Sequence, residues 1–168
     1  MRLLHTLLFV LIGFISFGQI LTPAKWSYSA SNQAPAVGDE IDLIFSATIE
    51  DNWYLYSSEF PCEDGPIKTT VTFKPHASYK LVGGLKAINP LAKHDDVFDC
   101  DVKIFKHKGE FRQKIKVLNA SLVIDGEAEY QTCSDIDGKC IPFNDEFSFN
   151  NIRVSGQKKV TRLLQTPL

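Results

Sequence analysis

The amino-acid sequence predicts a domain made mostly of β-strands, arranged as a sandwich or a barrel. Apolar and polar residues alternate over residues 41–49 and 102–106, which is the period of a half-buried strand. Dipeptides that favour turns separate the apolar runs, so we expect short connections between strands. These dipeptides are Gly38-Asp39, Asp51-Asn52, Gly83-Gly84, Lys108-Gly109, Asp125-Gly126 and Asp137-Gly138. Helical periodicity is weak throughout the chain before its C-terminal tail.

The remaining elements follow in chain order. The turn-rich stretch 57–66 contains two prolines and a glycine, and we expect it to form a long loop. Residues 111–118 and 121–130 are expected to form an antiparallel pair of strands. The segment 140–149 is expected to return beside that pair. The regular spacing of short strands and turns is typical of a sandwich or a barrel.

The first 18 residues have the pattern of an export signal. Arg2 gives a positive start, residues 3–17 are almost entirely apolar, and small residues precede a cleavage site before Gln19. An uncleaved membrane anchor is the alternative, but the apolar run is shorter than a usual membrane span. We therefore predict a signal peptide at 1–18, one domain at 19–154 and a tail at 155–168, which forms a short helix or a frayed end.

Composition excludes several classes of function. The chain has 18 Lys and Arg residues against 20 Asp and Glu residues, and this balance argues against nucleic-acid binding. The four histidines show no close metal-binding spacing with cysteine, so no metal site is expected. No phosphate-binding loop or nucleophilic serine motif is present, and no diffusible cofactor is expected.

The four cysteines are Cys62, Cys100, Cys133 and Cys140. An even number in an exported protein indicates disulfides, and four cysteines allow three pairings. If a strand ending at Cys133 runs antiparallel to one beginning at Cys140, their Cβ atoms come within disulfide range. A disulfide across so short a loop stabilises the fold less than one across a long loop, and reversible exchange is therefore the better explanation of this pair. An inert hairpin staple is the alternative.

The charges near the pair distinguish its two sulfurs. Lys139 favours a thiolate at Cys140, whereas Asp135 and Asp137 oppose ionisation near Cys133. Cys140 is therefore the better candidate nucleophile.

Three motifs, by their order and spacing along the chain, resemble those of one known family. They are Tyr130-Gln131-Thr132-Cys133 with Cys140-Ile141-Pro142, Trp53-Tyr54-Leu55-Tyr56 and His94-Asp95-Asp96-Val97-Phe98. Over residues 25–149 the chain resembles the N-terminal periplasmic domain of the transmembrane thiol:disulfide interchange protein DsbD. The resemblance implies an all-β, immunoglobulin-like β-sandwich in the periplasm. It also implies a cysteine pair that carries electrons from a membrane-embedded module, through a thioredoxin-like domain, to oxidised periplasmic proteins.

The resemblance also assigns roles to residues. Cys133 and Cys140 match the redox pair, with Cys140 forming the mixed disulfide. Phe98 matches the aromatic residue of a cap loop that covers the disulfide until a partner displaces it. Such a ring excludes small thiols, while a matching protein surface opens the loop.

Three further residues match the surroundings of the family's active site. Tyr54 and Tyr56 match aromatic residues that line it, and Asp96 matches an acid beside the cap. The alternative is that the tyrosines are core residues and Asp96 is a solvated loop acid. Val97 replaces an acidic residue that usually precedes the cap aromatic, which is expected to weaken the polar anchoring of the loop.

Two other departures concern the cysteines. Six residues separate Cys133 from Cys140, a longer insert than the family pattern, so the hairpin tip is expected to differ. Cys62 and Cys100 are additional. Because Cys100 lies two residues beyond Phe98 and Cys62 follows the tyrosine motif, we predict a Cys62 to Cys100 disulfide that tethers the cap region. Free or functional thiols are the alternative.

The prediction for function is a periplasmic thiol-disulfide exchange domain, a component of a protein-disulfide reductase. Its expected partners are a thioredoxin-like or membrane electron donor and oxidised periplasmic proteins. An exported immunoglobulin-like binding module with two inert disulfides is the alternative, since such folds host many functions.

Overall fold

The structure is a computed structural model that describes residues 21–62 and 64–156. The predicted signal peptide at 1–18 and residues 157–168 of the predicted tail lie outside this described part. Ten strands form the described chain: β1 (Ala24–Ala30), β2 (Glu40–Ile49), β3 (Trp53–Tyr56), β4 (Thr70–Phe73), β5 (Tyr79–Ala87), β6 (Leu91–Asp95), β7 (Cys100–Phe105), β8 (Lys108–Val117), β9 (Asp125–Ser134) and β10 (Cys140–Ser148). Within residues 21–62 and 64–156 no helix is long and apolar enough to cross a membrane.

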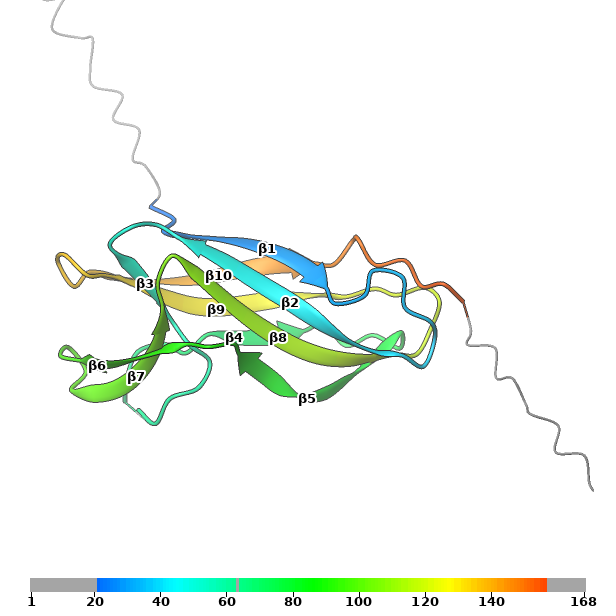
Figure 1. Cartoon of the computed structure of the whole chain (residues 1–168), viewed down its shortest axis with the longest axis horizontal. Helices are drawn as coiled ribbons and strands as arrows, with labels where there is room; N and C mark the ends of the chain where they lie inside the picture. Colours follow the sequence, from blue (N-terminus) through cyan, green and yellow to red (C-terminus); the bar gives the residue numbers. More distant parts are fainter. Residues whose placement is uncertain (1–20, 63, 157–168) are drawn as a thin grey trace, which may run out of the picture.

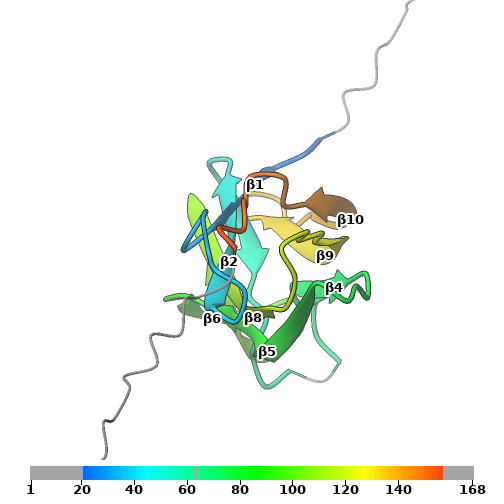
Figure 2. The same cartoon turned by 90° about the vertical axis from the view of Figure 1, so that its right-hand side faces the viewer.

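The strands form two antiparallel sheets that face each other (Figures 1 and 2). One sheet has the order β1-β2-β8-β5. The other has the order β10-β9-β3-β7-β6, with β4 also paired to β9. The predicted β-sandwich is therefore confirmed, and the long loop expected over 57–66 lies between β3 and β4.

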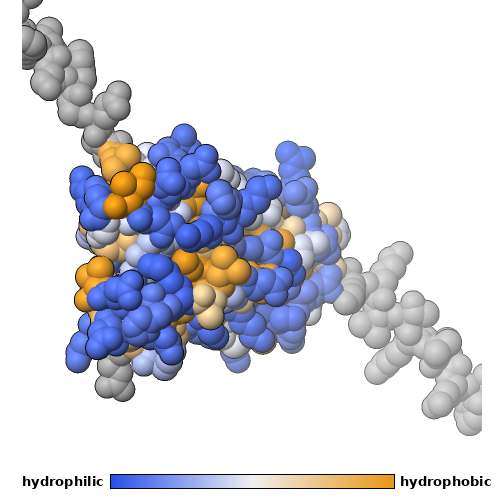
Figure 3. Space-filling view, turned by 60° about the vertical axis from the view of Figure 1, so that its left-hand side comes forward, coloured by the Kyte–Doolittle hydropathy of each residue, from blue (hydrophilic) through white to orange (hydrophobic). Residues whose placement is uncertain are grey.

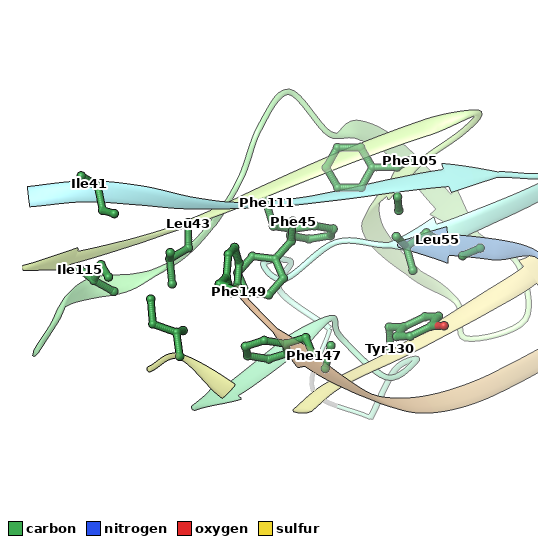
Figure 4. Close-up of a cluster of buried hydrophobic side chains, with 14 of the residues drawn as sticks. Ile41, Leu43, Phe45, Leu55, Phe105, Phe111, Ile115, Tyr130, Phe147 and Phe149 are labelled. Carbon is green, nitrogen blue, oxygen red and sulfur yellow. The ribbon is translucent and has the colours of Figure 1, made fainter. Parts of the chain in front are cut away.

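Alternating side chains explain why the two sheets pack together. In β2 the residues at every second position are buried, and Phe45 lies opposite Phe111 of β8. Both rings are fully buried in the core between the sheets (Figure 4). The ring of Phe45 packs edge-on against Phe147 of β10, with 5.0 Å between the ring centroids. Burial of each such side chain contributes roughly 1.5–3 kcal/mol.

The prediction that residues 111–118 and 121–130 pair with each other is wrong. The first segment is β8, which pairs with β2 and β5, whereas the second is largely β9, which pairs with β10, β3 and β4. Between them the chain crosses from one sheet to the other, and the amides of Leu118 and Asn119 both donate to the carbonyl of Ser78. The expected return of 140–149 beside the second segment is confirmed by the pairing of β10 with β9.

Three of the expected turn dipeptides lie inside strands instead, and one of them, Lys108-Gly109, begins β8. Gly83 and Gly84 belong to β5, where the register with β8 shifts between Val82 and Lys86. Gly126 belongs to β9, and a Cβ atom there would overlap the carbonyl oxygen of Thr72 and the ring of Phe147. Glycine at these positions serves a bulge and a close approach of strands rather than a turn.

Candidate active site

The sulfur pair lies at one end of the sandwich, where β9 and β10 form a hairpin. Cys133 lies directly opposite Cys140, and their Cα atoms are 4.1 Å apart. The amide of Ser134 donates to the carbonyl of Lys139, so the cysteines occupy the next, non-hydrogen-bonded pair of the ladder. Strands approach most closely at such pairs, which brings the two sulfurs within bonding distance. The structure contains the Cys133–Cys140 disulfide.

Hydrogen bonds order the six-residue connection between the two cysteines. Oγ of Ser134 accepts hydrogen bonds from the amides of Ile136 (3.2 Å) and Asp137 (3.4 Å). Hydrogen bonding to Ser134 and to the amide of Lys139 lowers the pKa of Asp137. Gly138 has a φ of 68°, a backbone conformation that favours glycine. The longer insert therefore forms an ordered tip.

The two sulfurs differ in exposure. Cys133 is fully buried, whereas Cys140 is partly exposed. Cys133 belongs to a cluster of buried side chains together with Tyr54, Tyr56, Phe60, Cys62, Val102 and Ile104. Phe98, Cys100 and Cys140 pack against this cluster. An incoming thiol therefore reaches Cys140 before it reaches Cys133.

A tyrosine and a buried carboxylate lie next to Cys133. The hydroxyl oxygen of Tyr56 is 3.6 Å from Sγ of Cys133, and it donates to Oδ2 of Asp95 at 2.5 Å. The hydroxyl of Tyr54 is 3.5 Å from the same Oδ2 atom. Burial, together with the hydrogen bond to Asp95, raises the pKa of Tyr56. Tyr56 is therefore a neutral phenol that links the inner sulfur to a buried acid.

Asp95 is only 1% exposed, yet it is held as a carboxylate. Burial alone would raise its pKa, but hydrogen bonds from Tyr56 and from the amides of Val97 and Phe98 outweigh burial, so the pKa is lowered. Lys93 adds to this effect, because its Nζ atom lies 3.9 Å from Oδ2 of Asp95. The same Nζ atom lies 4.1 Å from the centre of the Tyr54 ring.

The turn between β6 and β7 carries the aromatic residue expected to act as a cap, and we call residues 96–99 the cap turn. Oδ1 of Asp95 accepts hydrogen bonds from the amides of Val97 (3.1 Å) and Phe98 (3.4 Å). The Phe98 side chain is half-buried against the cluster that contains Cys133. Because the anchor uses backbone amides, an apolar side chain at position 97 does not remove the polar anchoring of the turn.

The acid that contacts the site is Asp95 rather than Asp96. Asp96 is exposed, while its neighbour is buried against both tyrosines. Tyr54 and Tyr56 alternate with Leu55, which packs into the core between the sheets, so β3 is buried on both faces. Two adjacent aspartates look alike in a sequence. The strand alternation that ends at Asp95 is the one signal that favours it as the inward-facing acid.

The second disulfide joins Cys62 to Cys100, with their Cα atoms 6.0 Å apart. This is the pairing expected from the position of Cys100 just beyond Phe98. Cys100 lies directly opposite Asp95 at the base of the cap turn. Gly65 packs so closely on this disulfide that a Cβ atom there would overlap Sγ of Cys62. The base of the cap turn is therefore bonded covalently to the loop between β3 and β4.

His94 lies on the outer side of the same hairpin. Its Nδ1 atom is 3.0 Å from Oδ1 of Asp101, and its Nε2 atom is 3.6 Å from Oδ1 of Asp99. The hydrogen bond with Asp101 raises the pKa of His94. In the part of the chain that the structure describes, no three His, Cys, Asp or Glu side chains are grouped to hold a metal ion.

Comparison with known proteins gives one family and several similar folds. The family described as "Thiol:disulfide interchange protein DsbD, N-terminal" matches residues 24–151. A comparison with curated proteins gives no match.

Among solved structures, the chain is similar to the DsbD N-terminal domain of Neisseria meningitidis in its complex with the PilB N-terminal domain. The identity is 17% and the TM-score 0.50, over 80% of this chain and 91% of that chain. The chain is also similar to the N-terminal periplasmic domain of ScsB from Proteus mirabilis, with 15% identity and a TM-score of 0.55 over 81% of this chain. It spans about half, 52%, of that protein's chain. These similarities support the immunoglobulin-like form of the sandwich, which is confirmed.

Proposed function

The chain belongs to the family of N-terminal domains of the thiol:disulfide interchange protein DsbD, and from this we propose that it is a periplasmic thiol-disulfide exchange domain. One observation carries the proposal: a buried sulfur and a partly exposed sulfur form a disulfide beside an aromatic cap turn. The chain would act as one component of a protein-disulfide reductase. The export pattern of residues 1–18 supports a periplasmic location.

In the reducing direction, both cysteines begin as thiols. The thiolate of Cys140 attacks one sulfur of an oxidised partner, and the partner's other sulfur leaves as a thiolate and takes up a proton. The thiolate of Cys133 then attacks Sγ of Cys140 and releases the partner's remaining thiol. Two electrons pass to the partner, and the Cys133–Cys140 disulfide is left. A thioredoxin-like or membrane donor returns the pair to the thiols by the reverse steps.

The exposure of the sulfurs fits this order of attack. Cys140 is partly exposed at the edge of the cluster that buries Cys133, so a partner's sulfur is expected to meet Cys140 first. Phe98 packs against that cluster, so movement of its ring would widen access to both sulfurs. The Neisseria meningitidis DsbD domain was solved in a complex with the PilB N-terminal domain, and this supports a protein as the exchange partner.

A redox titration separates this function from an inert staple. The chain is equilibrated with mixtures of reduced and oxidised dithiothreitol, and thiols are counted by mass after alkylation. We expect the Cys133–Cys140 pair to have a potential above about −300 mV, within reach of thioredoxin-like donors. The Cys62–Cys100 pair is the internal reference and should stay oxidised at the same redox potential of the dithiothreitol mixture. A Cys133–Cys140 potential as low as that of the reference pair would favour the binding-module alternative.

Trapping tests the assigned nucleophile. In Cys133→Ser, a mixed disulfide at Cys140 has no resolving thiol and should accumulate with an oxidised periplasmic protein. The matched variant is Cys140→Ser, which leaves the buried Cys133 thiol and should trap much less. Equal trapping by the two variants would contradict the assignment of Cys140.

A further inference from the structure

Two apolar side chains stand exposed on the turns that border the Cys133–Cys140 disulfide. Val97 in the cap turn is 67% exposed, and Ile136 at the tip of the β9–β10 hairpin is 77% exposed. Both turns lie at the same end of the molecule (Figure 1), and apolar surface appears among hydrophilic side chains in the view that brings this end forward (Figure 3). Side chains this exposed add little to the core, so folding alone does not explain them.

The backbone fixes both positions. The amide of Val97 donates to the buried carboxylate of Asp95, and the amide of Ile136 donates to Oγ of Ser134. A side chain on a backbone that is already ordered loses less conformational entropy when a partner binds. With the cap turn closed, Val97 and Ile136 are therefore ordered contact points on either side of the disulfide for the first encounter with a partner.

The cap turn is also acidic. Asp96 is exposed and the side chain of Asp99 is 97% exposed, and Asp101, just beyond the turn on β7, has a side chain that is 83% exposed. His94 is the cation next to these acids: it pairs with Asp99 and Asp101 and also interacts electrostatically with Asp96, so one histidine faces three exposed carboxylates. Charges this exposed attract a cationic surface over about 10 Å at moderate salt concentration.

We propose that Val97 and Ile136 form a two-point docking surface for a thioredoxin-like domain. The partner that fits has an apolar patch around its reactive cysteine and Lys or Arg side chains on the border that meets the cap turn. This inference rests on the proposed function and deepens it, because it states how the exchange partner is selected. The two apolar contacts set the approach to Cys140, and the acidic cap turn selects the charge of the partner.

The first test measures thiol-disulfide exchange between the oxidised chain and reduced thioredoxin. For each variant, the rate with thioredoxin is divided by the rate with dithiothreitol, which needs no docking surface. We expect this ratio to fall about tenfold or more in Ile136→Asp, because a carboxylate replaces an apolar contact. The matched control is Leu81→Asp, an exposed apolar residue (42%) on β5 of the other sheet, which should keep the wild-type ratio.

The second test uses two versions of thioredoxin in which residues bordering the reactive cysteine are changed to Lys or to Glu. The wild-type chain should react several-fold faster with the Lys version at low salt, and the preference should shrink at high salt. The double variant Asp96→Asn/Asp99→Asn removes the charge with little change of shape and should lose most of the preference.

The outcomes separate the two levels of the proposal. If the wild-type chain exchanges with dithiothreitol but with neither version of thioredoxin, the proposed function fails and the docking surface fails with it. If the wild-type chain exchanges with thioredoxin and Ile136→Asp keeps the wild-type ratio, the docking surface is overturned and the proposed function stands. No preference for the Lys version would overturn the charge selection.

Discussion

The two disulfides close loops of very different length, and this difference predicts what each contributes to stability. Cys62 and Cys100 are 38 residues apart in sequence, whereas Cys133 and Cys140 are 7 residues apart. A disulfide lowers the conformational entropy of the unfolded chain, and the effect grows with the logarithm of the loop length. The same chain therefore offers a long-loop disulfide and a short-loop disulfide for direct comparison.

The perturbation is the removal of each disulfide in turn, as Cys62→Ala/Cys100→Ala and as Cys133→Ala/Cys140→Ala. The loop-entropy relation gives a loss of about 4 kcal/mol for the first variant and about 2.4 kcal/mol for the second. Domains of this size are typically stable by about 5–15 kcal/mol, so both variants are expected to fold. Cys62 is also buried, and the cavity left by its sulfur adds to the first loss.

The assay is equilibrium unfolding in urea, followed by the fluorescence of Trp26 and Trp53 in the described sandwich. The free energies of unfolding of the two variants are compared with that of the oxidised wild-type chain. We expect the Cys62/Cys100 variant to lose more stability, by about 1.5 kcal/mol or more. A loss no greater than that of the Cys133/Cys140 variant would refute the reasoning that one disulfide serves stability and the other serves exchange.

Three further predictions concern the cap. Replacing Phe98 with Ala should speed oxidation of the reduced Cys133–Cys140 pair by small disulfides several-fold, measured by stopped-flow fluorescence; unchanged rates would argue against shielding. Because the pKa of Asp95 is lowered, its stabilising effect is complete above the unfolded value of 3.8 and is lost as pH falls through the folded value. The difference in free energy of unfolding between wild type and Asp95→Asn should therefore be largest near neutral pH and shrink at about pH 3. A difference that does not change with pH would contradict a stabilising role of the ionised Asp95 side chain. For His94 the folded pKa is raised, so NMR titration should place it above 6.5 and Asp101→Asn should lower it; no change in that variant would contradict the ion pair.

The fold could be predicted from the sequence in outline but not in pairing. Alternation in residues 41–49 identifies a strand with one buried face, and β2 covers those residues. The same alternation does not identify the partner strand, which is why the segments that became β8 and β9 were assigned to each other. Their separation into two sheets depends on the crossing between them, which is fixed by contacts with Ser78 that no local pattern encodes.

The two disulfide pairings could be predicted from the sequence better than the strand pairing. Cys133 and Cys140 are joined across a hairpin, and the Asp137-Gly138 turn signal lies between them as expected. The sequence predicts Asp96 as an acid beside the cap, and Asp96 lies in the cap turn, whereas the buried acid that contacts both tyrosines is its neighbour Asp95. Both residues have the same side chain, and only the tertiary contact with Tyr56 distinguishes them. The sequence of a loop does not show which of two adjacent aspartates is buried.

The contacts of the cap turn limit how it can open. Asp95 at one end is held by a buried hydrogen bond from Tyr56, and Cys100 at the other end is bonded to Cys62. In the proposed exchange, opening would therefore be confined to residues 96–99 and would break the two amide hydrogen bonds that Asp95 accepts. Hydrogen bonds to a charged group contribute roughly 1.5–3 kcal/mol each, so an open turn would be a minor state of the free chain. A partner that binds the open turn more tightly than the closed one offsets this cost, whereas a small thiol has no surface with which to do so.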